Sequence, residues 1–206
     1  MAGAGFGPSS GHAFRTGTIL TYGYLAGRGL LAFVMVLAVA GKLSDVESRR
    51  AFRASLEALA WVPRALRPTL PLSVMVAEAA LIVLLAIPQT ALLGLVLCAL
   101  FLSVVTAALA AARAAGGDIR CACFGADDRP VEGWHFVRNG LLILIATGTF
   151  LAGTLPAHDQ ASAFDVPAVA AGVAISSGML CAVALTHWRD LSFLFGTAGS
   201  QSTDRG

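Results

Sequence analysis

The stretch "ILTYGYLAGRGLLAFVMVLAVA", residues 19–40, holds a single charged side chain, Arg28, among its 22 residues. As an α-helix rising 1.5 Å per residue it would be ~33 Å long, enough to cross the ~30 Å hydrocarbon core of a bilayer. Its last three residues imitate a signal-peptide cleavage site, but more apolar runs follow, which favours a retained helix. Those runs predict four further spans, at about 72–87, 91–111, 134–155 and 167–187. The sequence therefore predicts an all-α, polytopic membrane helical bundle of about five transmembrane helices.

The composition supports this class of protein. The 206 residues are 57% hydrophobic and 13% charged, whereas soluble domains carry roughly a quarter charged residues. A net charge of +2 without a basic cluster argues against a nucleic-acid partner, which leaves the lipid bilayer as the expected surroundings. Four cysteines are too few for a disulfide-stapled secreted scaffold. No glycine-rich phosphate loop follows a strand, so no cofactor is indicated.

The chain divides into one transmembrane domain and two polar ends. We expect residues 1–18 to be a disordered lead, residues 19–190 one transmembrane domain, and residues 191–206 a polar tail. Within the charged segment 41–70, apolar residues recur at helical spacing opposite basic and acidic ones. The apolar set is Phe52, Leu56 and Leu59, and the polar set is Arg49, Arg50, Arg53 and Glu57. This pattern predicts an amphipathic helix that lies in the membrane interface.

The basic residues are distributed unequally over the two membrane faces. With five spans, segments 41–70 and 112–133 and the tail share one face, which holds eleven basic residues. The other face has Arg15 alone, since Arg28 and Arg138 lie within spans. The positive-inside rule therefore predicts that segment 112–133 is cytoplasmic and the N-terminus external.

The polar stretch "GGDIRCACFGADDRP", residues 116–130, carries Cys121 and Cys123 one residue apart. Such a pair is a redox couple, a metal site or an inert loop. The Cα atoms of an extended C-x-C lie near the upper limit of disulfide geometry, about 6.8 Å, so a bond between them would be strained. A strained disulfide is more readily reduced and suits a redox shuttle, and Arg120 would favour the thiolate.

The metal alternative rests on an incomplete set of ligands. A structural zinc site needs four ligands, and His135 with either Asp127 or Asp128 could add to the two thiols. No second C-x-C or C-x-x-C stands nearby, so we assign no metal. Cys98 and Cys181 fall in predicted spans and are expected to act as small apolar residues.

Charged residues within spans are costly and point to function or pairing. Arg28 and Glu78 lie on successive spans, so we expect an ion pair between them, with a role in packing as the alternative. Lys42 ends the first span and could extend toward the interface. Arg138 and Asn139 open the fourth span, where they could approach the thiols, bind loop carbonyls or anchor the interface.

Together these residues resemble one known family. The segment "AGKLSD" closes the first span, Pro71 precedes Glu78 by seven residues, and "CACFG" is followed by "VRNGLLIL". Over roughly residues 25–150 this pattern is similar to the MauE family of methylamine utilisation, grouped with DoxX-like redox-associated membrane proteins.

The resemblance implies a helical bundle like that of vitamin K epoxide reductase, and a role in maturation or export of the disulfide-rich small subunit of methylamine dehydrogenase. It also implies that Cys121 and Cys123 are the redox pair, supported by Arg28, Lys42, Glu78, Arg138 and Asn139. A role on an exported partner conflicts with the charge count, which places the cysteines inside. Six of the eleven basic residues lie in segment 41–70, whose amphipathic helix could bind anionic lipid on either leaflet, so the orientation is left open.

Two other classes of function remain. One is a non-enzymatic membrane assembly or export factor whose cysteines are structural or bind zinc. The other is a small-molecule transporter, which Arg28 and Glu78 permit but the absence of broken-helix repeats disfavours.

Overall fold

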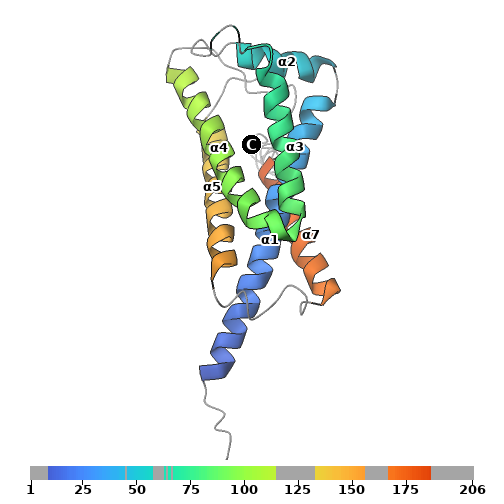
Figure 1. Cartoon of the computed structure of the whole chain (residues 1–206), viewed down its shortest axis with the longest axis vertical. Helices are drawn as coiled ribbons and strands as arrows, with labels where there is room; N and C mark the ends of the chain where they lie inside the picture. Colours follow the sequence, from blue (N-terminus) through green and yellow to red (C-terminus); the bar gives the residue numbers. More distant parts are fainter. Residues whose placement is uncertain are drawn as a thin grey trace, which may run out of the picture.

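The computed structural model describes residues 9–44, 46–57, 63, 65, 67–114, 133–155 and 167–186. Over these residues the regular structure is entirely helical, without strands. The elements are α1 Ser9–Leu43, α2 Val46–Glu57, α3 Leu70–Ala86, the short 3₁₀ helix η1 Pro88–Thr90, α4 Ala91–Ala114, α5 Gly133–Thr154 and α7 Ala168–Thr186 (Figure 1). The predicted helical membrane bundle is confirmed.

Among the described residues, four helices are long and apolar enough to cross a membrane, and a further apolar helix is shorter. The four candidate spans are Gly17–Leu43, Pro88–Ala114, Gly133–Thr154 and Ala168–Leu185. The fifth helix, α3, has 17 residues and so measures ~26 Å at 1.5 Å per residue. The predicted second span is thus a short helix, whose first turn includes Pro71 as a tolerated N-terminal proline.

The start of α1 differs from the prediction. The helix begins at Ser9, inside the segment 1–18 that we expected to be a disordered lead. Extending an existing helix fixes one residue per hydrogen bond and avoids the cost of nucleation, so even weak helix formers can continue it. The tail 191–206 lies outside the described residues, as do parts of the predicted domain 19–190.

Helix α1 is the central element of the bundle. It contacts α3, α5 and α7 along its length, and α4 packs between α3 and α5 (Figure 1). Helix α7 lies close against α1 because both have small residues at the crossing. A Cβ atom added to Gly178 would collide with the carbonyl oxygen of Ala26, and one added to Gly29 would come within 3.1 Å of Ile175.

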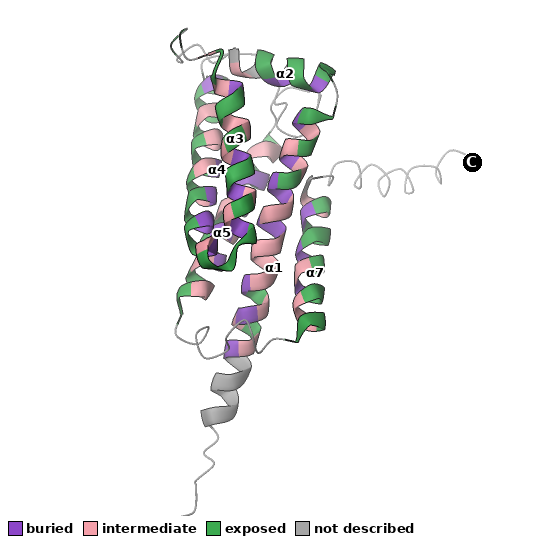
Figure 2. Ribbon diagram, turned by 45° about the vertical axis from the view of Figure 1, so that its right-hand side comes forward, coloured by how far each residue is buried: buried purple, intermediate pink, exposed green. Residues whose placement is uncertain are grey.

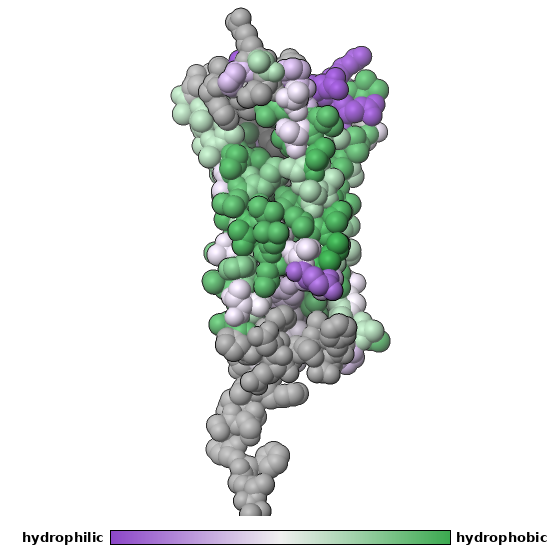
Figure 3. Space-filling view, viewed as in Figure 1, coloured by the Kyte–Doolittle hydropathy of each residue, from purple (hydrophilic) through white to green (hydrophobic). Residues whose placement is uncertain are grey.

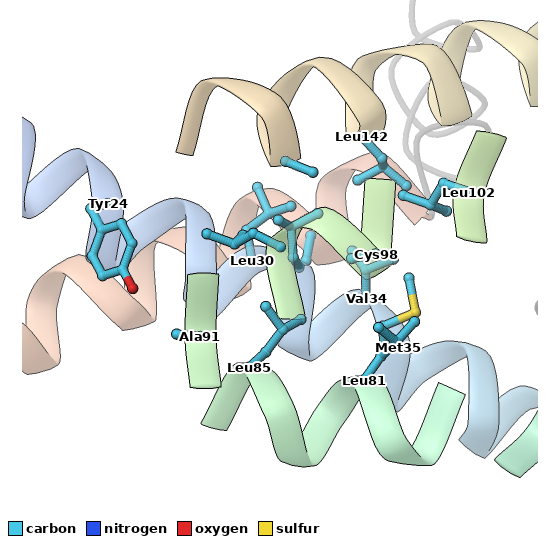
Figure 4. Packing of buried hydrophobic residues seen from close by; sticks show 14 residues of the cluster. Tyr24, Leu30, Val34, Met35, Leu81, Leu85, Ala91, Cys98, Leu102 and Leu142 are labelled. Carbon is cyan, nitrogen blue, oxygen red and sulfur yellow. The ribbon is translucent and has the colours of Figure 1, made fainter. Parts of the chain in front are cut away.

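The core fills the space between α1, α3, α4 and α5. Its most deeply buried members include Leu31, Val34 and Met35 of α1, Leu81 and Leu85 of α3, Leu95 and Cys98 of α4, and Leu142 of α5 (Figure 4). The outer faces are also apolar, since Leu144 of α5 and Val173 and Leu180 of α7 are each more than half exposed. Figure 2 shows the exposed residues of α7 in green. An apolar band of this kind around a bundle fits a lipid bilayer.

Helix α2 lies across the end of the bundle at which α1 ends and α3 begins (Figure 2). Ser48 and Phe52 are buried, while Arg49, Arg50 and Arg53 are exposed. The predicted amphipathic helix is therefore present. Leu59, expected on its apolar face, lies outside the described residues.

Candidate functional site

A buried ion pair joins α1 to α3 below α2. Lys42 Nζ donates to Glu78 Oε1 at 2.5 Å, and the two side chains are 2% and 5% exposed. Phe52 of α2 covers the pair, with Nζ 5.0 Å from the centroid of its ring, which is within the range of a cation–π interaction. Three helices thus converge on one lysine.

This pairing corrects two expectations. Glu78 binds Lys42 and not Arg28, and Lys42 is buried instead of extending to the interface. The reason lies in the antiparallel arrangement of α1 and α3. Each Cα–Cβ bond tilts toward the N-terminus of its own helix, so Lys42 leans into the bundle and Glu78 leans toward α2. Arg28, also on α1, leans away from Glu78, toward the far end of the bundle.

The second carboxylate oxygen of Glu78 is buried without a hydrogen-bond partner among the described residues. A buried polar atom left in this state is costly, and it often marks a place where a ligand, a water or a moving group is received. Glu78 lies eight residues into α3, about 12 Å from its start. This oxygen is therefore a buried acceptor in the half of α3 that is nearer to α2.

Arg28 has a separate role at the opposite end of α3. Its guanidinium donates to the carbonyl oxygen of Leu85 and, at 2.6 Å, to that of Ala86, the last two residues of α3. Thr90 Oγ1 donates to the carbonyl oxygen of Leu84 at 3.0 Å. The last carbonyls of a helix have no intrahelical partner, so Arg28 and Thr90 cap a short helix close to the hydrocarbon.

Arg138 and Asn139 are buried in the second turn of α5, at 5% and 6% exposure. Asn139 Nδ2 donates to Thr106 Oγ1 of α4 at 3.1 Å, and Thr106 donates in turn to the carbonyl oxygen of Leu102 at 2.6 Å. This chain of bonds links α4 and α5 in the half of the bundle nearer to α2. Burial of Arg138 argues against a simple interface anchor.

Cys121 and Cys123 lie outside the described residues. The described chain stops at Ala114 and resumes at Gly133, and these helix ends belong to the α2 end of the bundle (Figure 1). Among the described residues no group of three or more His, Cys, Asp or Glu side chains could hold a metal ion. Asp127 and Asp128, the acidic zinc ligands considered above, also fall outside.

The five supporting residues thus separate into two groups. Lys42, Glu78, Arg138 and Asn139 lie toward the α2 end, whereas Arg28 is 14 residues from Lys42, about 21 Å along α1. Sequence reasoning missed Thr106, because a lone threonine in an apolar span is unremarkable without its partner on the next helix.

The comparisons with known proteins give one match. The family model described as "Methylamine utilisation protein MauE" matches residues 20–152, from α1 to α5. Neither a curated protein nor a solved structure matches the chain.

Proposed function

Because the chain belongs to the MauE family, we propose that it is a cell-membrane protein that supports thiol–disulfide exchange with a partner protein through Cys121 and Cys123. The observation that carries the proposal is the C-x-C pair in the segment between α4 and α5 of a MauE-type bundle. The partner is a thiol-bearing or disulfide-rich protein, in the methylamine utilisation process that names the family.

The arrangement of the helices supports this assignment. Cys121 is seven residues beyond Ala114, so covalent geometry keeps it within about 25 Å of that helix end at 3.6 Å per residue at most. The far end of α4, which has 24 residues, is about 36 Å away. This short connection to Ala114 supports an exchange site toward the end of the bundle that holds Lys42, Glu78, Arg138 and Asn139.

The exchange needs two sulfur atoms in sequence. A partner thiolate attacks one sulfur of the oxidised Cys121–Cys123 pair, and the other cysteine leaves as a thiolate. A second partner thiolate then resolves the mixed disulfide, so that the partner gains a disulfide and the pair becomes two thiols. Two electrons pass to the pair, and the reverse sequence reduces a partner disulfide.

The test replaces Cys121 and Cys123 by serine, singly, in the full chain in its native membrane. In each variant the remaining cysteine can still attack a partner disulfide, but the cysteine that would resolve the mixed disulfide is missing. We therefore expect one of the two variants to accumulate the mixed disulfide with the partner, detectable on non-reducing gels. Cys98→Ser and Cys181→Ser are matched controls, because these thiols lie on α4 and α7 and leave the C-x-C intact. Unchanged partner oxidation in both C-x-C variants, or stoichiometric zinc in the purified protein, would favour the non-enzymatic assembly factor instead.

A further inference from the structure

The outward surface of α2 carries three exposed arginines. Arg49 and Arg53 are four residues apart, and Arg50 and Arg53 are three apart, so the three side chains are neighbours on the helix. Phe52 holds the opposite side of α2 against Lys42 of the bundle. The arginines are thus fixed in direction by the packing of the helix that carries them. We call these three residues the arginine face.

The arginine face borders the apolar band of the bundle. Figure 3 shows a hydrophilic patch on the rim of the bundle at the α2 end, directly above the apolar band of the spans. Leu43, the last residue of α1, is 45% exposed, and Val46, the first of α2, is 53% exposed. The rim therefore presents apolar side chains next to guanidinium groups, which is the character of the boundary between acyl chains and headgroups.

From this placement we propose that the arginine face of α2 is a binding site for the phosphate headgroups of anionic phospholipids. A guanidinium group binds phosphate oxygens through two parallel hydrogen bonds. The three neighbouring guanidinium groups can therefore bind the closely spaced phosphates of a lipid surface. Exposed Leu43 and Val46 favour a lipid over an acidic soluble protein, because their burial in the leaflet accompanies binding of the headgroup. The site is independent of Cys121 and Cys123.

The test measures lipid preference on the full chain purified in neutral detergent. The protein is offered equal amounts of phosphatidylglycerol and phosphatidylcholine with the same acyl chains, and the lipids that remain bound are counted by native mass spectrometry. We expect the wild type to retain phosphatidylglycerol preferentially. Each of R49Q, R50Q and R53Q should lower that preference about five-fold, as expected for the loss of one basic group near an anionic surface.

Two controls show whether a change in lipid preference comes from the arginine face. Arg113→Gln removes an exposed arginine of α4 at the same end and should leave the preference within about two-fold of wild type, since surface charges away from a site matter little. In the wild type the preference should fall as salt is raised to about 1 M, where the screening length is about 3 Å. This second measurement needs no variant to fold.

Several outcomes would overturn the proposal. They are an equal affinity for the two lipids, a triple variant R49Q/R50Q/R53Q that keeps the preference, and an Arg113→Gln variant that loses as much as a variant of α2. A stronger loss with inorganic phosphate than with chloride at equal ionic strength would assign the surface to free phosphate.

Discussion

Replacing Lys42 by methionine should destabilise the fold more than any exposed substitution, because it leaves the Glu78 carboxylate buried without its partner. The variant keeps most of the volume of the side chain and removes the ammonium group that binds Glu78 Oε1. Breaking a buried ion pair from one side typically costs 3–5 kcal/mol. Oε2 has no hydrogen-bond partner among the described residues, so no second bond is seen there to soften the loss. We therefore expect a loss of about 3–5 kcal/mol in the free energy of unfolding.

The reciprocal variant, Glu78→Leu, should cost less. Lys42 lies in the last turn of α1, and its long side chain can turn toward water once the carboxylate is gone. Glu78 is short and lies about 12 Å from the start of α3, so it cannot follow the same route. We expect a loss of about 1–2 kcal/mol for Glu78→Leu, and recovery of most of the loss in the double variant, because an apolar pair often replaces a buried ion pair without penalty.

The assay is unfolding of the full chain in mixed micelles, with the mole fraction of sodium dodecyl sulfate raised stepwise and helicity followed by circular dichroism. Glu47→Leu and Arg53→Met are matched controls, because both side chains are exposed on α2, and each should fall within about 0.5 kcal/mol of wild type. A double variant as unstable as the sum of its two single variants would show that Lys42 and Glu78 do not interact, contrary to the prediction.

Two further predictions concern the helix ends and the helix crossing. Arg28→Leu removes the two bonds that cap the last carbonyls of α3 and should cost about 3–6 kcal/mol, at about 1.5–3 kcal/mol for each bond to a charged group. Arg28→Lys should recover part of this loss in the same micelle unfolding assay, and equal stability of all three proteins would contradict the cap. Gly178→Ala should loosen α7 from α1 because the new methyl group meets the Ala26 carbonyl, whereas Gly172→Ala has open space around its Cβ. Proteolysis of the α7 segment measures the difference, and equal cleavage of the two variants would argue against the crossing.

The spans were predictable because a helix in a bilayer needs an apolar surface of its own. This requirement is met within one segment of sequence, as the high hydropathy of 91–111 and 134–155 shows. The pairing of Glu78 was harder, since it depends on the register between two helices. Both cations lie on α1, 14 residues apart, and the tilt of the Cβ atoms favours Lys42 over Arg28 as the partner of Glu78.

The ends of the bundle could be assigned only in part. Composition predicts α2 as an interfacial helix, but its contact with Lys42 through Phe52 depends on a packing that no local pattern records. The bond between Asn139 and Thr106 is likewise a contact between two spans. The Cys121–Cys123 pair lies outside the described residues, so its predicted chemistry still rests on the sequence and the family.

The α2 end of the bundle connects the two proposals. The arginine face lies there, and so do Ala114 and Gly133, which flank the cysteine segment (Figure 1). The positive-inside rule predicts that this end is cytoplasmic, and an arginine face that binds anionic headgroups predicts the same, because the cytoplasmic leaflet is negatively charged. The two predictions share residues, because segment 41–70 supplies six of the eleven basic residues counted for this face and three of the six form the arginine face. If both hold, Cys121 and Cys123 act on a partner before its export, in a compartment that keeps thiols reduced, and the exchange is then expected to run in the direction that reduces a partner disulfide.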